Sequence, residues 1–152
     1  MTSTEPDTHI SEALQILIEL GMPLQQQNDR SALCLLALLD LTPEKNWQQA
    51  SNPLIGITPI MDWIFEHYKK KYAPNSRETI RRQTIHQFHD AGLVTENPDD
   101  PNRPVNSPYF VYQIEPETLI LLKSFNTAKW NENLINFHKN HKKLIDRYAK
   151  RR

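Results

Sequence analysis

The chain has 152 residues with no net charge at pH 7, and 38% of them are hydrophobic, so it has the size of one domain with a small core. It contains no run of about eighteen apolar residues and its polar, acidic start differs from a signal peptide, so we expect a cytoplasmic protein without a membrane span. The single cysteine, Cys34, excludes an internal disulfide and a zinc-finger framework, and its leucine-rich surroundings predict a buried thiol rather than a nucleophile.

The first third of the chain predicts a tail and two helices. We expect residues 1–8 to be disordered and residues 9–152 to form a single domain. Apolar residues recur at helical spacing from His9 to Leu20, and Gly21 is suited to end that helix. Asn28 is a suitable N-cap for a second helix that runs to Leu41, and its run of leucines is typical of a central, buried helix.

The next segment predicts two helices joined by a tight turn. Residues 54–57 form a short apolar stretch that favours a strand, and Thr58 followed by a proline is a strong helix start. This helix should fade near Tyr72. Asn75 or Ser76 then caps a helix that runs to residue 91, where a glycine follows.

A hairpin and two more helices complete the predicted domain. Residues 93–96 and 109–114 favour strands, and the loop between them, residues 97–108, is rich in Pro, Asn and Asp. Helices are expected at 116–125 and 128–149. The last has a seam of side chains at alternating spacings of four and three, namely Trp130, Leu134, Phe137, His141, Leu144 and Tyr148. The seam suits either a homodimer contact or packing on the domain's own helices, and we favour the second.

This order of elements is that of a winged helix. The predicted fold is mainly α with a small β-hairpin, a winged helix-turn-helix with additional N- and C-terminal helices. Its core spans residues 28–114, and residues 115–150 supply the C-terminal helices. In helix-turn-helix proteins the second helix of the pair enters the major groove of DNA.

The charge is unevenly distributed along the chain. Residues 1–66 carry nine acidic and two basic side chains, net −7, whereas residues 67–91 carry six basic and two acidic ones, net +4. Residues 92–137 have a net charge of −3 and residues 138–152 one of +6. The first basic block coincides with the second helix of the pair, which favours an interaction with nucleic acid over two merely solvated helix faces.

One face of that helix carries side chains that read bases. At about 100° per residue, Ile80, Thr84, Ile85, Phe88 and Ala91 form a core face, and the opposite face presents Thr79, Arg82, Gln83, His86 and His89. Arginine grips guanine with two hydrogen bonds and glutamine grips adenine. The predicted DNA-binding residues are Lys70, Asn75, Ser76, Arg77, Thr79, Arg81, Arg82, Gln83, His86 and, at the tip of the wing, Arg103. Arg77 and Arg81 point sideways, toward phosphates or over apolar surface.

Several segments resemble the N-terminal helix-turn-helix region of BsuBI/PstI-type restriction endonucleases. The matching stretches are residues 35–41, 50–58, 72–84, 97–108 and 112–114. The most specific of them is Pro-Asn-Ser-Arg-Glu-Thr-Ile-Arg-Arg-Gln, residues 74–83, and the resemblance covers about residues 33–148.

The resemblance implies a target-recognition domain of an enzyme that cuts duplex DNA with Mg²⁺. Its metal-binding residues would lie in a C-terminal nuclease domain, where a Pro-Asp precedes an acidic residue, any residue and lysine. Pro98-Asp99 occurs here, but no acidic residue is followed two positions later by lysine. We therefore expect no catalytic residue and no cofactor in this chain, with double-stranded DNA and the nuclease domain as its partners.

Three other functions are compatible with the same pattern. A free-standing transcriptional regulator would use the same helix, a protein-interaction module would lack salt-sensitive DNA affinity, and an intact small nuclease would cleave DNA with magnesium. The histidine pairs 86/89 and 138/141 have the spacing of metal ligands but lack a third ligand in sequence, so we expect no metal site.

Overall fold

The computed structural model describes residues 6–151, with side chains described for residues 8–141. Helix α1 begins at Pro6. The expectation of a disordered tail is therefore wrong for residues 6–8, and its first five residues lie outside the described part.

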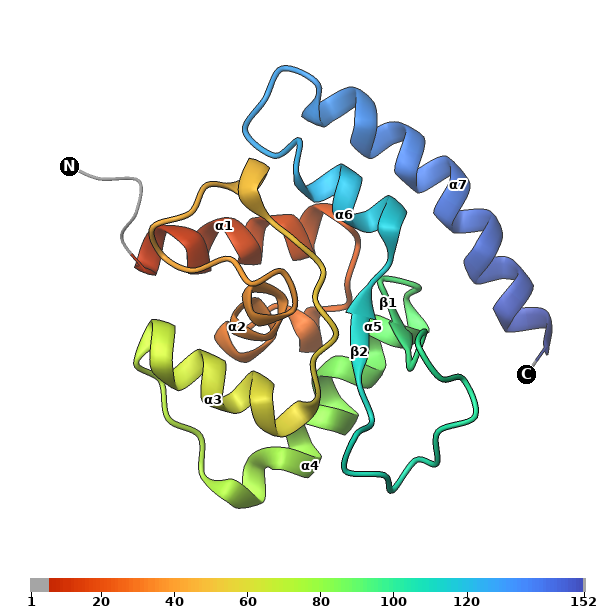
Figure 1. The fold of residues 1–152 in the computed structure, drawn as a ribbon. Coiled ribbons are helices and arrows are strands. Elements are labelled where there is room, and N and C mark those ends of the chain that lie inside the picture. The colour runs from red at the N-terminus through yellow and green to blue at the C-terminus, as the bar shows by residue number, and fades with distance from the viewer. Residues whose placement is uncertain (1–5, 152) are drawn as a thin grey trace.

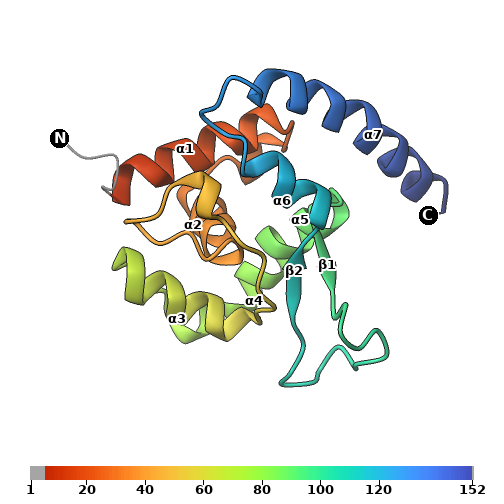
Figure 2. The same ribbon diagram turned by 45° about the horizontal axis from the view of Figure 1, so that its top comes forward.

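The elements follow one another in the order of a winged helix (Figures 1 and 2). The helices and strands are α1 (Pro6–Glu19), α2 (Asp29–Leu38), α3 (Ile57–Tyr68), α4 (Arg77–Ile80), α5 (His86–Asp90), β1 (Val94–Glu96), β2 (Tyr112–Ile114), α6 (Pro116–Leu122) and α7 (Trp130–Arg151). Three single 3₁₀ turns lie between them, η1 (Leu24–Gln26), η2 (Trp47–Gln49) and η3 (Pro74–Ser76). A π-helical turn, η4 (Arg81–Ile85), joins α4 to α5.

Helix α2 is the centre of the molecule, seen nearly end-on in Figure 1 with α1 and α3 on either side. Every residue from Ser31 to Leu38 is buried. The predicted N-cap is confirmed, because the Asn28 side chain accepts a hydrogen bond from the Ser31 amide at 2.8 Å. The helix ends earlier than predicted, at Leu38 instead of Leu41, and Asp40 follows in a left-handed conformation with φ 48°.

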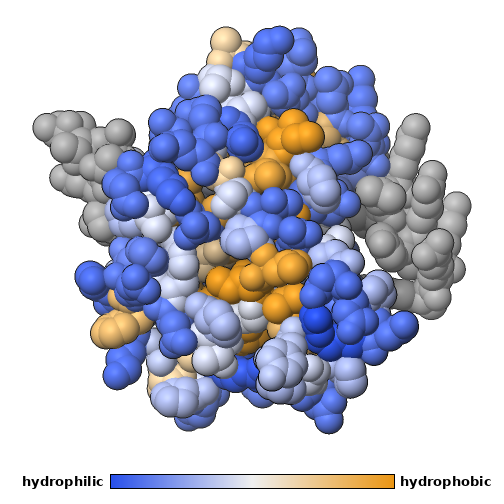
Figure 3. All heavy atoms as spheres, in the orientation of Figure 1, coloured by the Kyte–Doolittle hydropathy of each residue, from blue (hydrophilic) through white to orange (hydrophobic). Residues whose placement is uncertain are grey.

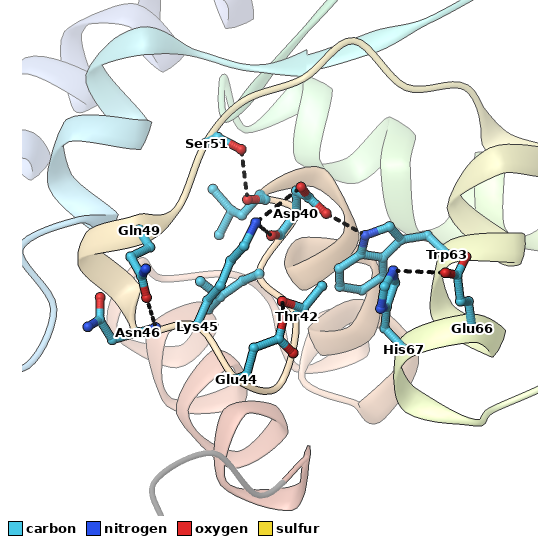
Figure 4. A network of polar contacts seen from close by, with 12 residues as sticks. Asp40, Thr42, Glu44, Lys45, Asn46, Gln49, Ser51, Trp63, Glu66 and His67 are labelled. Atoms are coloured by element: carbon cyan, nitrogen blue, oxygen red, sulfur yellow. Dashed lines mark hydrogen bonds and ion pairs between the residues drawn. The ribbon is translucent and has the colours of Figure 1, made fainter.

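Polar contacts around Asp40 connect the end of α2 to α3 (Figure 4). The Trp63 indole donates a hydrogen bond of 2.7 Å to Asp40 Oδ1. Lys45 donates to both the carbonyl and the carboxylate of Asp40, at 3.1 and 3.3 Å. The Tyr68 hydroxyl donates to the Leu41 carbonyl at 2.8 Å. The bonds from Trp63 and Tyr68 fix α3 relative to the end of the central helix, and those from Lys45 hold the loop that follows this helix.

Three details of the α3 region differ from the prediction. In place of a strand over residues 54–57, a single bridge pairs Ile55 with Tyr112, through hydrogen bonds of 3.0 and 2.9 Å. The helix already begins at Ile57 with Gly56 as N-cap, so Thr58 is not the cap. It ends at Tyr68 rather than near residue 72, because Lys69 adopts a left-handed conformation with φ 60°.

The helix predicted over residues 76–91 is present but interrupted by η4. The amide of His86 donates to the Arg81 carbonyl, five residues back, which is the signature of a π turn. The predicted core face is confirmed for four of its five residues, since Ile80, Thr84, Ile85 and Phe88 are fully buried. The fifth, Ala91, is only partly buried. Within the turn, Thr84 Oγ1 accepts a hydrogen bond of 2.9 Å from Arg30 Nε, which connects η4 to α2.

The hairpin is shorter than predicted. Strands β1 and β2 pair antiparallel, with Val94 opposite Ile114 and Glu96 opposite Tyr112. Residues 109–111 precede the second strand instead of belonging to it, and Tyr109 is 74% exposed. The fold class is nevertheless confirmed, a mainly helical domain with a two-stranded hairpin and the architecture of a winged helix.

Helices α6 and α7 pack on the rest of the domain (Figure 1). The Trp130 ring lies edge-on to Phe125 at 5.0 Å, and its indole donates to Glu19 Oε1 at 3.0 Å. Further along α7, the His141 ring stacks on Phe137 and hydrogen-bonds the carbonyl of residue 91. This part of the predicted seam therefore packs within its own chain, whereas the side chains of residues 144 and 148 lie outside the described ones. Over residues 6–151 no helix is long and apolar enough to cross a membrane.

We predict that Gly92→Ala destabilises the domain more than Gly21→Ala. Both glycines have positive φ, 80° and 86°, so alanine costs about 1–2 kcal/mol of conformational energy at either position. A Cβ at Gly92 would also lie 2.7 Å from His141 Cε1, whereas at Gly21 it would meet nothing within 4 Å.

Since the His141 ring is held by stacking and a hydrogen bond, its displacement should add a loss of about 1 kcal/mol in the free energy of unfolding. Urea denaturation of both variants measures this difference. Equal losses would show that the docking of α7 does not depend on the close approach at Gly92.

Candidate nucleic-acid interface

A groove separates the α4–α5 segment (residues 77–90, including η4) from the loop between β1 and β2. It has a volume of about 550 Å³. We call it the wing groove, and it is lined by Ile57, Arg77, Glu78, Arg81, His86, Glu96, Val105, Asn106, Ser107, Pro108, Phe110 and Tyr112. A second hollow adjoins it at Arg77 and reaches the segment before α3. Figure 3 shows an apolar patch over that segment, where Leu54 is 43% exposed.

The N-terminal end of the α4–α5 segment carries most of the predicted site residues. Asn75 and Arg77 are exposed, and Ser76 and Thr79 are partly buried. Arg77 is anchored to the preceding helix, because its Nε donates to Thr58 Oγ1 at 3.1 Å. Predicted residue Lys70 lies in the connection after α3, exposed, with its ammonium 5.6 Å from the centre of the Tyr72 ring. The turn between the two helices therefore collects basic and amide side chains.

The middle of the segment divides its exposed residues between two sides. The side chain of Arg82 is 72% exposed, and that of His86, which lines the wing groove, is 43% exposed. Gln83 is also exposed but lines a separate hollow with Arg30 and the η1 turn. The structure thus brings Arg77, Arg81 and His86 together at the groove and leaves Gln83 beside the connection between α1 and α2.

Glu78 joins two of the arginines and was not among the predicted site residues. Its carboxylate accepts two hydrogen bonds from Arg81, 2.8 Å from Nε and 2.9 Å from Nη2, and one of 3.1 Å from Arg82 Nε. The hydrogen bond from Arg81, assisted by the charges of both arginines, holds the pKa of Glu78 at about 2. The signal in the sequence was an acidic residue three and four positions before two arginines, a spacing that pairs charges on a helix.

Arg103 forms hydrogen bonds within the wing loop, residues 97–108. The Arg103 guanidinium donates to both carboxylate oxygens of Asp99, at 3.1 and 2.8 Å, and to Asn97 Oδ1 at 3.1 Å. Its side chain is only 16% exposed. The hydrogen bonds from Arg103 lower the pKa of Asp99, so the two charges stay paired. The residue predicted to contact DNA from the wing tip therefore closes the loop instead of projecting from it.

Asn97 is the buried residue among those that the Arg103 guanidinium contacts. It is 3% exposed and has a φ of 46°, a conformation that asparagine tolerates better than most residues. Its side-chain oxygen accepts from the Val111 amide at 2.9 Å, and its own amide donates to the Val111 carbonyl at 2.8 Å. Asn97 thus joins both ends of the wing loop and receives Arg103 at the same oxygen.

The two histidine pairs, 86/89 and 138/141, contact other elements of the domain. His86 and His89 both lie near Glu96 of β1, at 4.0 and 3.9 Å. His138 hydrogen-bonds the Glu19 carbonyl at 2.8 Å and His141 bonds the carbonyl of residue 91, so this pair joins α7 to the domain. Within the described residues, no group of three or more His, Cys, Asp or Glu side chains is arranged to hold a metal ion.

The thiol of Cys34 is buried, as predicted. It lies in the middle of α2 with no exposed surface, and this burial raises its pKa to about 12. The neutral thiol form is therefore the one present at physiological pH, and a neutral thiol is a poor nucleophile.

Comparison with known proteins decides the family. Residues 7–146 match the family described as the BsuBI/PstI restriction endonuclease HTH domain. The chain belongs to this family. It is 57% identical over 145 residues to the type II restriction enzyme BsuBI of Bacillus subtilis, an alignment that covers 95% of this chain and 46% of the relative.

Two further relatives agree with this assignment. The type II restriction enzyme AplI of Arthrospira platensis is 40% identical over 156 residues, covering 100% of this chain and 48% of that protein. The structure of the SdaI restriction endonuclease superposes with a TM-score of 0.80 at 35% identity, over 84% of this chain and 40% of that one. The chain spans about half the length of the curated relatives that it matches.

We predict that Asn97→Ala loosens the wing loop. The change removes the acceptor shared by the Val111 amide and Arg103, and an unpaired, partly buried amide costs about 1–3 kcal/mol. Amide hydrogen exchange should therefore accelerate at Val111 and across β2. Asn102→Ala, at an exposed asparagine of the same loop, is the control. Equal exchange in the two variants would refute the anchoring role of Asn97.

Proposed function

We propose that this chain is the DNA-binding, target-recognition domain of a type II restriction endonuclease whose catalytic domain lies outside these residues. The observation that carries the proposal is the two-sided α4–α5 segment. Its apolar face is fully buried, and its other face presents arginines beside the wing groove. The membership of the family and the restriction enzymes among its relatives favour this function over a free-standing regulator or a protein-interaction module.

In this proposal α3 and the α4–α5 segment form the helix-turn-helix, and the segment enters the major groove. Arg82 supplies base contacts, because its side chain is the most exposed of the paired arginines. The phosphate backbone would pass the start of the helix, where it would meet Lys70, Asn75, Ser76 and Arg77. The contact with DNA would be completed by Thr79, Gln83 and His86. Arg81 borders the groove but is held by Glu78, and Arg103 supports the wing.

The nuclease reaction is assigned to the rest of the enzyme. This chain spans about half of its relatives' length, and none of its acidic residues is followed two positions later by lysine. We therefore propose that the catalytic residues and their Mg²⁺ belong to a nuclease domain that works beside this one. DNA binding by these 152 residues should then be independent of divalent metal.

We predict that Arg82→Ala strongly weakens binding to the preferred duplex. A bidentate contact to guanine contributes about 1–3 kcal/mol of discrimination, which corresponds to a loss of about 5- to 150-fold in affinity. Fluorescence anisotropy with a duplex selected by the unmodified chain measures this loss. Lys123→Ala, which removes a positive charge from an exposed residue after α6, should leave the affinity nearly unchanged.

The same titration tests the mode of binding. The logarithm of the affinity should fall by about 0.9 per phosphate contact with the logarithm of the salt concentration. EDTA should have no effect on binding. A chain whose binding is insensitive to salt, or to Arg82→Ala, would contradict the proposed interface.

A further inference from the structure

We propose that Glu78 is a specificity-determining residue of this interface, because it positions the Arg82 guanidinium for the recognition of guanine. The inference rests on the proposed function and concerns the selection among DNA sequences rather than the strength of binding.

The hydrogen bonds around Glu78 leave the reading end of Arg82 available. Among the described residues, the Arg82 side chain is held only through its Nε, by Glu78 Oε2 at 3.1 Å. Its two terminal nitrogens are the pair that grips O6 and N7 of guanine, and 72% of the side chain is exposed. The carboxylate thus fixes the stem of the guanidinium and leaves its outer edge for a base.

Arg81 serves as the anchor of this arrangement. It donates from both Nε and Nη2 to the two oxygens of Glu78, and its side chain is only 23% exposed. A bidentate pair of this kind fixes the plane of the carboxylate as well as its position. Arg81 therefore orients Glu78, and Glu78 in turn orients Arg82.

Electrostatics argues against a role of Glu78 in affinity. With Glu78 ionised, the three side chains carry a net charge of +1, whereas the two arginines alone would carry +2. A carboxylate on a surface that faces phosphates weakens non-specific attraction, which depends on positive charge. The carboxylate instead orients the Arg82 side chain. A long side chain that is already oriented loses less conformational entropy when it binds.

Glu78→Gln in the full chain tests this role, with Glu117→Gln as the control. Both changes remove one negative charge from an exposed residue, but Glu117 lies on α6, outside the wing groove. The unmodified chain first selects its preferred sequence from a randomised duplex library. The affinities of each variant are then measured for that duplex and for poly(dA-dT), which lacks the O6 and N7 acceptor pair of guanine.

For Glu78→Gln we expect an affinity for poly(dA-dT) that is equal or up to several-fold higher. The ratio of the affinity for the selected duplex to that for poly(dA-dT) should fall at least tenfold. Glu117→Gln should leave the ratio unchanged. In the double variant with Arg82→Ala, the Glu78 change should cause little further loss of the ratio, because its effect passes through Arg82. Nitrogen-15 spectra of the free protein should lose the protected Nε–H signals of Arg81 and Arg82 in Glu78→Gln.

These measurements distinguish a failure of the proposed function from a failure of the role of Glu78. If the unmodified chain selects no sequence, the proposed function fails. If it selects one and Glu78→Gln keeps the full ratio, or adds its loss independently of Arg82→Ala, only the positioning role of Glu78 fails. Retained Nε–H signals in that variant would likewise overturn it.

Discussion

The burial of α2 is the constraint on which the other elements depend. Eight consecutive residues, Ser31–Leu38, have no side that faces water, so the helix needs neighbours all round. Helices α1 and α3 and the η4 turn supply three of them. Because η4 lies inside the segment proposed to read DNA, the position of that segment is set by packing on α2 and by the Arg30–Thr84 hydrogen bond.

The sequence predicted well those parts of the fold whose position is determined by the burial of apolar side chains. Ile80, Thr84 and Phe88 fall on the core face because a spacing of four residues is close to one turn of an α-helix and of a π turn alike. The Asn28 cap was predictable because an asparagine side chain directly before a helix accepts a hydrogen bond from a free backbone amide of the first turn. The ends of elements were less predictable, since the left-handed Lys69 that ends α3 carries no sequence signal of its own. The early end of α2 is better indicated, because aspartate, the residue type at position 40, tolerates the left-handed conformation better than most residues.

The candidate site was predicted as a face but not as a network. Helical periodicity placed Arg82 and Gln83 on the exposed face, and the structure agrees. The other residues predicted on that face are only partly exposed, namely Thr79, His86 and His89. Periodicity did not predict that Arg103 would donate hydrogen bonds to Asp99 and Asn97, because these contacts depend on the conformation of the loop. The angular position of a residue on a helix does not show its contacts, so periodicity alone does not predict that two arginines share Glu78. In a protein without net charge, such pairings decide which of its positive charges remain available to a polyanion.

The η4 turn has a consequence for the comparison of related enzymes. A π turn has one more residue than an α-helical turn, so side chains beyond it are rotated relative to those before it. Residues of α4 and α5 therefore do not share one continuous helical register. Transplanting a base-contacting pair from a homologue with a regular helix would rotate one member out of alignment. Under the proposed function, a redesign of the recognised DNA sequence should therefore keep exchanged residues on the same side of this turn.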